Sequence, residues 1–131
     1  MITIKRLLFG IVVLLLTSCA STVKFPISSV TPAAEITAKM TQDKHKNFVI
    51  EVTAYNMASA DRLDPPKNNY IVWIVSENNG TMNIGQLTIK NGEKSYLKTS
   101  TPFKVKEIFI TAEDESDISY PSGTEISRTT F

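Results

Sequence analysis

The chain has 131 residues and nearly balanced charge, with 14 Lys and Arg against 13 Asp and Glu and a net charge of +1. It lacks the basic excess that binds nucleic-acid phosphates, so we expect no nucleic-acid partner. One Cys and one His cannot form an internal disulfide or supply the usual ligands of a zinc site, so we expect no metal and no cofactor.

Residues 1–18 have the pattern of a signal peptide. Lys5 and Arg6 precede an apolar run of about ten residues, and small residues lead to Cys19. The run is too short for a membrane-spanning helix, which needs about twenty apolar residues. Leu16-Thr17-Ser18-Cys19 resembles the lipobox of bacterial lipoproteins. This resemblance implies cleavage before Cys19, a diacylglycerol on its sulfur and an acylated amino terminus.

Processing at Cys19 predicts a mature chain of 113 residues with a net charge close to −1, a length suited to one domain. Two or more acyl chains bind a membrane stably. Ala20 and Ser21 provide no acidic signal of the kind that retains some lipoproteins in the inner membrane. By that analogy we expect a lipid-anchored protein of the cell envelope, in the outer membrane and facing the periplasm, with the leaflet left open.

Residues 19–33 comprise the lipidated cysteine and a stretch of small hydroxyl residues with two prolines and no strand or helix period. We expect this stretch to be a flexible tether and residues 34–131 to be the folded domain. In the alternative, Phe25 and Ile27 pack on the domain.

Alternating apolar and polar side chains, one continuous apolar run and the turns between them predict about seven strands in the folded domain. They cover residues 35–40, 48–55, 70–75, 84–89, 95–98, 105–111 and 125–130. The segment 70–75 is apolar on both faces, which is typical of a central strand. Asn79-Gly80 and Asn91-Gly92 favour tight hairpins.

The loop before the central strand is marked by Asp64-Pro65-Pro66, and Met57–Leu63 is either loop or one short helical turn. Turn signals recur about every ten residues, a spacing typical of a sandwich. The predicted fold is therefore an all-β, antiparallel β-sandwich of about seven strands, Ig-like in appearance.

Five short motifs follow one another along residues 35–130 in an order that matches a known protein family. They are Leu63-Asp64-Pro65-Pro66, Tyr70-Ile71-Val72-Trp73, Asn83-Ile84-Gly85-Gln86-Leu87, Thr111-Ala112-Glu113 and Tyr120-Pro121-Ser122-Gly123. Their order and spacing resemble the C-terminal domain of anti-sigma-K factors, which implies an extracytoplasmic β-sandwich. The resemblance does not carry over that family's regulatory function, because sigma-factor binding belongs to a separate cytoplasmic domain. A glycine-rich stretch of the family is replaced here by residues 114–119.

Three groups of residues are candidates for a site. The acidic run at residues 113–117 could bind calcium through its carboxylates, but a solvated turn is the favoured interpretation. Tyr70 and Trp73 lie on opposite faces of a strand, and we expect Trp73 in the sandwich core rather than in a ligand groove. His45 is expected to be solvated in a turn. No nucleophile, base and orienting group occur in a recognisable pattern, so we predict no catalytic residues and no enzyme.

These observations favour a membrane-anchored envelope lipoprotein whose non-catalytic sandwich serves as an interaction or structural module. Its expected partners are the membrane, through the lipid on Cys19, and an envelope protein. The alternative is an extracytoplasmic sensory module that acts on a membrane-bound regulator without a sigma-binding domain of its own.

Overall fold

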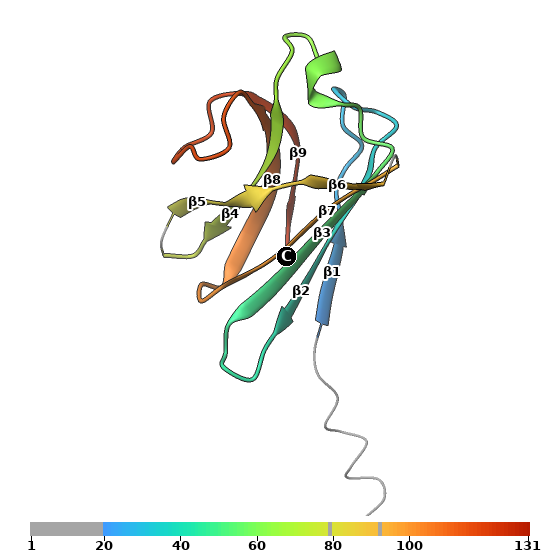
Figure 1. Ribbon diagram of the computed structural model, residues 1–131. Coiled ribbons are helices and arrows are strands. Elements are labelled where there is room, and N and C mark those ends of the chain that lie inside the picture. Colours follow the sequence, from blue (N-terminus) through green and yellow to red (C-terminus); the bar gives the residue numbers. More distant parts are fainter. Residues whose placement is uncertain (1–19, 79, 92) are drawn as a thin grey trace, which may run out of the picture.

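The computed structural model describes residues 20–78, 80–91 and 93–131. They form two antiparallel sheets packed face to face, which confirms the predicted all-β sandwich (Figure 1). Sheet A has five strands in the order β1-β2-β3-β7-β6, and sheet B has four in the order β5-β4-β8-β9. The strands are β1 (Ala20–Lys24), β2 (Glu35–Gln42), β3 (Phe48–Tyr55), β4 (Asn69–Ser76), β5 (Gly80–Gln86), β6 (Thr88–Asn91), β7 (Lys94–Thr101), β8 (Val105–Glu113) and β9 (Thr124–Thr130).

The chain after Cys19 is folded where the sequence predicted a flexible tether. Residues 20–24 form β1, which pairs with β2 in a register that runs from Ala20 opposite Thr41 to Lys24 opposite Thr37. Phe25 follows with 4% exposure, and its N–H donates to the Ile36 carbonyl at 2.9 Å. The flexible tether expected over 19–33 is therefore wrong for its described part, 20–33, because β2 offers an edge that β1 completes. Cys19 and the predicted signal peptide lie outside the described residues.

A second difference concerns the predicted strand at 84–89, which is divided between the two sheets. β5 ends at Gln86 in sheet B, and β6 begins at Thr88 in sheet A. Between them, the Leu87 N–H donates to the Tyr70 carbonyl at 3.0 Å, and the Leu87 side chain is buried. The chain thus changes sheets at Leu87, and together with β1 this division accounts for nine strands rather than seven.

The main core lies between the sheets and follows the alternation predicted from the sequence. On β3, Ile50, Val52 and Ala54 point into it, and on β4, Val72 and Ile74 do the same. β4 lies between β5 and β8, so the prediction of a central strand at residues 70–75 is confirmed. Burial of one such side chain contributes about 1.5–3 kcal/mol, so these alternating positions are the main stabilising element of the sandwich.

A second apolar cluster covers the opposite face of sheet B. Ile71, Trp73 and Phe109 are buried there, apart from the main core, and Ile118 packs against them. Trp73 and Phe109 stack with ring centroids 6.1 Å apart, and the Arg128 guanidinium lies 3.9 Å from the Phe109 centroid. The prediction that Trp73 lies in the core between the sheets is therefore wrong. It is buried because the β8–β9 loop, residues 114–123, supplies a cover on the outer face.

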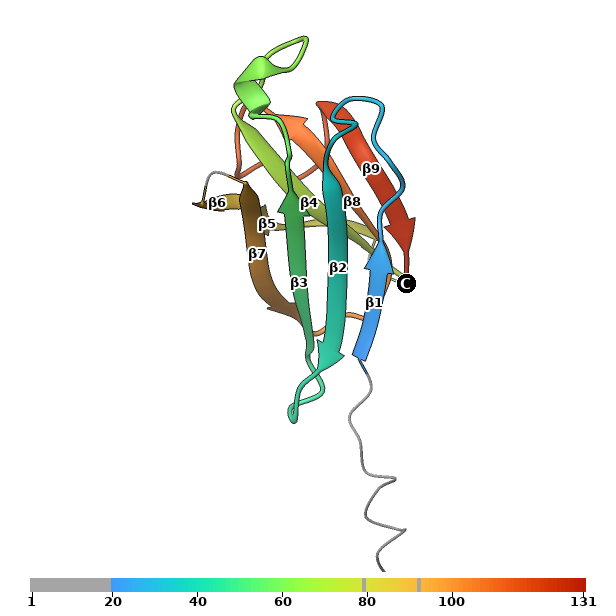
Figure 2. The same ribbon diagram turned by 90° about the vertical axis from the view of Figure 1, so that its right-hand side faces the viewer.

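The antiparallel registers define two ends of the sandwich, which we name after a residue at each (Figure 2). The Ala20 end holds the start of β1, the β2–β3 turn at residues 43–47 and the β7–β8 loop at residues 102–104. The Tyr70 end holds the segment 56–68, which contains the short 3-10 helix η2 (Ala60–Arg62), and the 114–123 loop. An eight-residue strand such as β2 separates the two ends by about 27 Å.

Phe25 and Ile27 provide a direct check that residues 20–33 belong to the domain. Phe25→Ala should lower the free energy of unfolding by about 3 kcal/mol, because it leaves a cavity in the core. Ile27→Ala is the control, since Ile27 is 81% exposed and its truncation should change stability by less than about 0.5 kcal/mol. Urea denaturation followed by fluorescence of Trp73, the single tryptophan, measures both. If both substitutions changed the free energy of unfolding by the same small amount, residues 20–33 would not be part of the folded domain.

Candidate functional site

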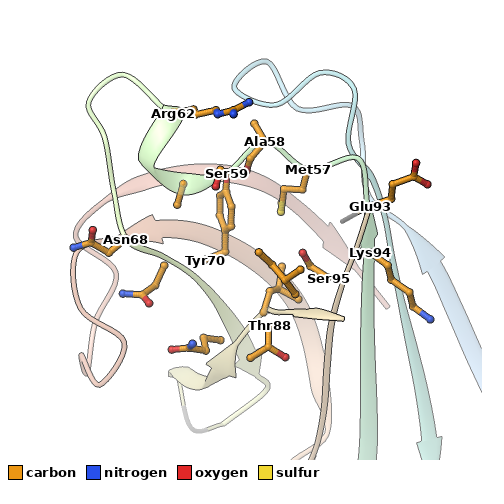
Figure 3. A pocket seen from close by; sticks show the side chains of 15 residues that line it. Met57, Ala58, Ser59, Arg62, Asn68, Tyr70, Thr88, Glu93, Lys94 and Ser95 are labelled. Atoms are coloured by element: carbon orange, nitrogen blue, oxygen red, sulfur yellow. Dashed lines mark hydrogen bonds between the residues drawn. The ribbon is translucent and has the colours of Figure 1, made fainter. Parts of the chain in front are cut away.

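A cavity of about 590 Å³ opens at the Tyr70 end (Figure 3). This volume is within the range of small-molecule binding sites. Four segments that are distant in sequence build it: the stretch after β3, the start of β4, the β5–β6 junction and the start of β7. The lining residues are Met57, Ala58, Ser59, Ala60, Arg62, Asn68, Asn69, Tyr70, Gln86, Leu87, Thr88, Ile89, Glu93, Lys94 and Ser95.

Tyr70 ties one wall of the cavity to the sandwich. Its Oη donates a hydrogen bond to the Ala58 carbonyl at 2.6 Å. Burial, and then the negative charge of Asp61, raises the pKa of Tyr70 to about 12. The phenol therefore stays protonated at neutral pH and serves as a fixed donor.

Backbone hydrogen bonds shape the same wall around η2. The Arg62 N–H donates to the Ser59 carbonyl at 2.9 Å, and the Lys67 N–H donates to the Ala60 carbonyl at 2.9 Å. The second bond closes the loop that contains Asp64-Pro65-Pro66, as the sequence predicted for these prolines. Of the two alternatives for Met57–Leu63, the structure has one short helical turn, at Ala60–Arg62.

Three charged residues line the cavity, Arg62, Glu93 and Lys94, and the last two are directed away from it. Figure 3 shows the side chains of Glu93 and Lys94 pointing outward from it. The Lys94 ammonium lies 5.6 Å from the Tyr96 ring centroid and 6.0 Å from that of Tyr55, on the outer face of sheet A. Apart from the Arg62 guanidinium, the lining therefore consists chiefly of apolar side chains and neutral hydrogen-bonding groups, which suit a largely uncharged ligand or peptide segment.

One side of the cavity is joined to the 114–123 loop. The Asn68 and Asn69 side-chain amides donate to the Asp114 carbonyl at 3.1 and 3.2 Å. Lys67 forms an ion pair with the Asp114 carboxylate at 3.4 Å. The segment before β4 and the loop after β8 are thus one connected surface.

The prediction that the whole acidic run at 113–117 is a solvated turn is wrong for Glu113, which is buried at the end of β8. Its side chain is only 2% exposed. Its carboxylate accepts hydrogen bonds from the Thr111 hydroxyl at 2.5 Å, from the Ser122 hydroxyl at 3.0 Å and from the backbone N–H groups of Ser122 and Gly123. Trp73 Nε1 in turn donates to the Thr111 oxygen at 2.8 Å. The carboxylate therefore fastens the loop that covers Trp73.

Burial and hydrogen bonding act in opposite directions on this carboxylate. Burial alone would raise the pKa of Glu113, but the donors from Thr111, Gly123 and Ser122 favour the ionised form and leave the pKa below its ordinary value. Gly123 is required for this arrangement, because a Cβ at that position would lie 1.8 Å from the Ala112 carbonyl oxygen. The segments Thr111-Ala112-Glu113 and Pro121-Ser122-Gly123, noted for their sequence pattern, meet here.

The remaining predicted candidates lie apart from the cavity. Asp114, Glu115 and Asp117 are exposed, and the described residues contain no group of three or more His, Cys, Asp or Glu side chains suited to a metal. His45 is exposed in the β2–β3 turn at the Ala20 end, as predicted. The sequence did not indicate the cavity, because its lining comes from four separate segments and includes no motif of known chemistry.

Comparisons with protein-family models, with curated proteins and with solved structures found no match for this chain. Within the described ranges, no helix has the length and apolar character needed to cross a membrane.

The Glu113 network predicts a specific pH dependence of stability. Because the folded state lowers the pKa of Glu113, its contribution is complete above the ordinary value of 4.5 and is lost as the pH falls through the folded value. Glu113→Gln should lower the free energy of unfolding by about 2 kcal/mol at neutral pH, since it leaves buried donors poorly matched. The difference from the unmodified protein should shrink below pH 4.5.

Urea denaturation across that pH range measures the effect, with Asp117→Asn as the control at an exposed position of the same loop. The control should change stability by less than about 0.5 kcal/mol. A Glu113→Gln difference that stays constant with pH would contradict the role given to the carboxylate.

Proposed function

We propose that this protein is a lipid-anchored lipoprotein of the cell envelope, in the outer membrane and facing the periplasm, with a non-catalytic sandwich that serves as an interaction module. The lipobox-like segment Leu16-Thr17-Ser18-Cys19 carries the proposed anchor, and the direction of β1 carries the orientation that follows from it. This strand begins at Ala20, next in the chain to Cys19, and leads away from the Ala20 end. A lipid on Cys19 would hold that end at the membrane and turn the Tyr70 end outward.

The cavity is at the end that would face away from the bilayer. About 27 Å separates it from the start of β1, estimated from the eight residues of β2. This separation favours contact with a partner in the envelope over contact with lipid. The mostly neutral lining, in which Arg62 is the charged group not directed outward, and the exposed Ile89 at the rim, 74% accessible, suit a largely apolar segment of such a partner.

The anchor is tested by the mass of the first peptide released by trypsin from the membrane-extracted protein. We expect residues 19–24, ending at Lys24, with a diacylglycerol on the Cys19 sulfur and an acyl group on its amine. An unmodified peptide of residues 7–24, which begins after Arg6, would contradict both cleavage and lipidation.

Photo-crosslinking in living cells tests the interaction surface. A photoreactive residue in place of Ile89 should give a discrete adduct with an envelope protein, because Ile89 is at the rim of the cavity. The matched control replaces Ile27, which is also apolar and exposed but does not line the cavity. Identical adducts from both positions, or none from position 89, would contradict the proposal.

A further inference from the structure

The β2–β3 turn carries a compact set of basic side chains at the Ala20 end. Lys44, His45 and Lys46 are consecutive and exposed. Among the residues that the structure describes, neither lysine forms an ion pair. On the neighbouring β7–β8 loop, by contrast, Lys104 is 4.0 Å from the Glu77 carboxylate and is partly neutralised by it.

The acidic residue of the turn is directed inward. The Asp43 carboxylate accepts hydrogen bonds from the His45 N–H at 2.8 Å and from the Asn47 N–H at 3.0 Å. The Asp43 N–H also donates to the Asn47 carbonyl at 2.9 Å, which closes the turn. Asp43 thus fixes the shape of the turn from inside, and the two ammonium groups form its outer surface.

The register of β1 and β2 places this turn close to the predicted anchor. Ala20 lies opposite Thr41, and Lys44 follows Thr41 by three residues, or about 10 Å of extended chain. Cys19 and Ala20 are joined by a peptide bond, which separates their Cα atoms by about 3.8 Å. A lipid on Cys19 would therefore bring Lys44 and Lys46 to the level of the phospholipid headgroups.

We propose that the β2–β3 turn is a second membrane contact, in which Lys44 and Lys46 bind anionic phospholipid headgroups; this inference rests on the proposed lipid anchor. A lysine near an anionic surface favours the contact roughly fivefold, so two favour it about 25-fold. The anchor supplies attachment, and the turn fixes orientation, with the Tyr70 end directed away from the bilayer.

The test measures the reactivity of individual lysines toward an amine-acylating reagent in the full lipoprotein, reconstituted in vesicles. One set contains phosphatidylcholine alone, and the other contains about one third phosphatidylglycerol; neither lipid has a primary amine. Peptide mass spectrometry then gives the rate at each lysine. Lys24 and Lys39 are internal controls, because both are exposed but lie on β1 and β2, away from the turn.

We expect Lys44 and Lys46 to react about tenfold more slowly in the anionic vesicles, while Lys24 and Lys39 keep the same rate. About 1 M salt, at which the Debye length is about 3 Å, should remove the protection. Equal rates for Lys44 and Lys46 in both vesicles would overturn the inference and leave the anchor intact. Protein that is recovered with neither vesicle would overturn the anchor and this inference together.

Discussion

The pairing of β1 with β2 is the constraint on which the rest of the account depends. It turns a short segment of small and hydroxyl residues into an edge strand, and the Phe25 N–H extends the pairing to Ile36 at 2.9 Å. Phe25 then enters the core, and Ser127 donates a hydrogen bond to the Pro26 carbonyl at 2.8 Å, which joins the first segment of the domain to the last strand. The folded domain therefore includes the chain from Ala20 onward.

Because β1 is part of the sandwich, the orientation of the domain relative to Ala20 is fixed. A tether would let the domain rotate freely about its attachment, and no end of it would be assigned to the membrane or to a partner. With β1 ordered from its first residue, the two ends are separated by the length of one strand and differ in chemistry. The Ala20 end presents two lysines on a closed turn, whereas the Tyr70 end presents a cavity lined chiefly by apolar and neutral polar side chains. In the proposed function, membrane attachment and partner binding would therefore lie at opposite ends of one small domain.

The sequence predicted the parts of the fold in which burial follows a regular period. β3 and β4 were foreseen because alternating or continuous apolar residues fill the core at fixed intervals. β1 has exposed residues at four of its five positions, so it shows no such pattern, and its pairing partner alone reveals it. The alternation along β4 also predicted that Trp73 and Tyr70 lie on opposite faces of the sheet. It did not show which of these faces the irregular 114–123 loop covers. The cavity was beyond prediction because no local pattern connects its four segments.

Hydrogen exchange at the amides of β1 distinguishes an ordered edge strand from a flexible tether. The account predicts that the Phe25 N–H, and the β1 amides that face β2, exchange as slowly as amides of β2 itself, because both take part in the same ladder. The measurement is made on the membrane-extracted full chain, reconstituted in vesicles, by exchange followed by peptide mass spectrometry. Complete exchange of residues 20–25 at the earliest time, with β2 still protected, would show a tether in place of a strand and would contradict the account.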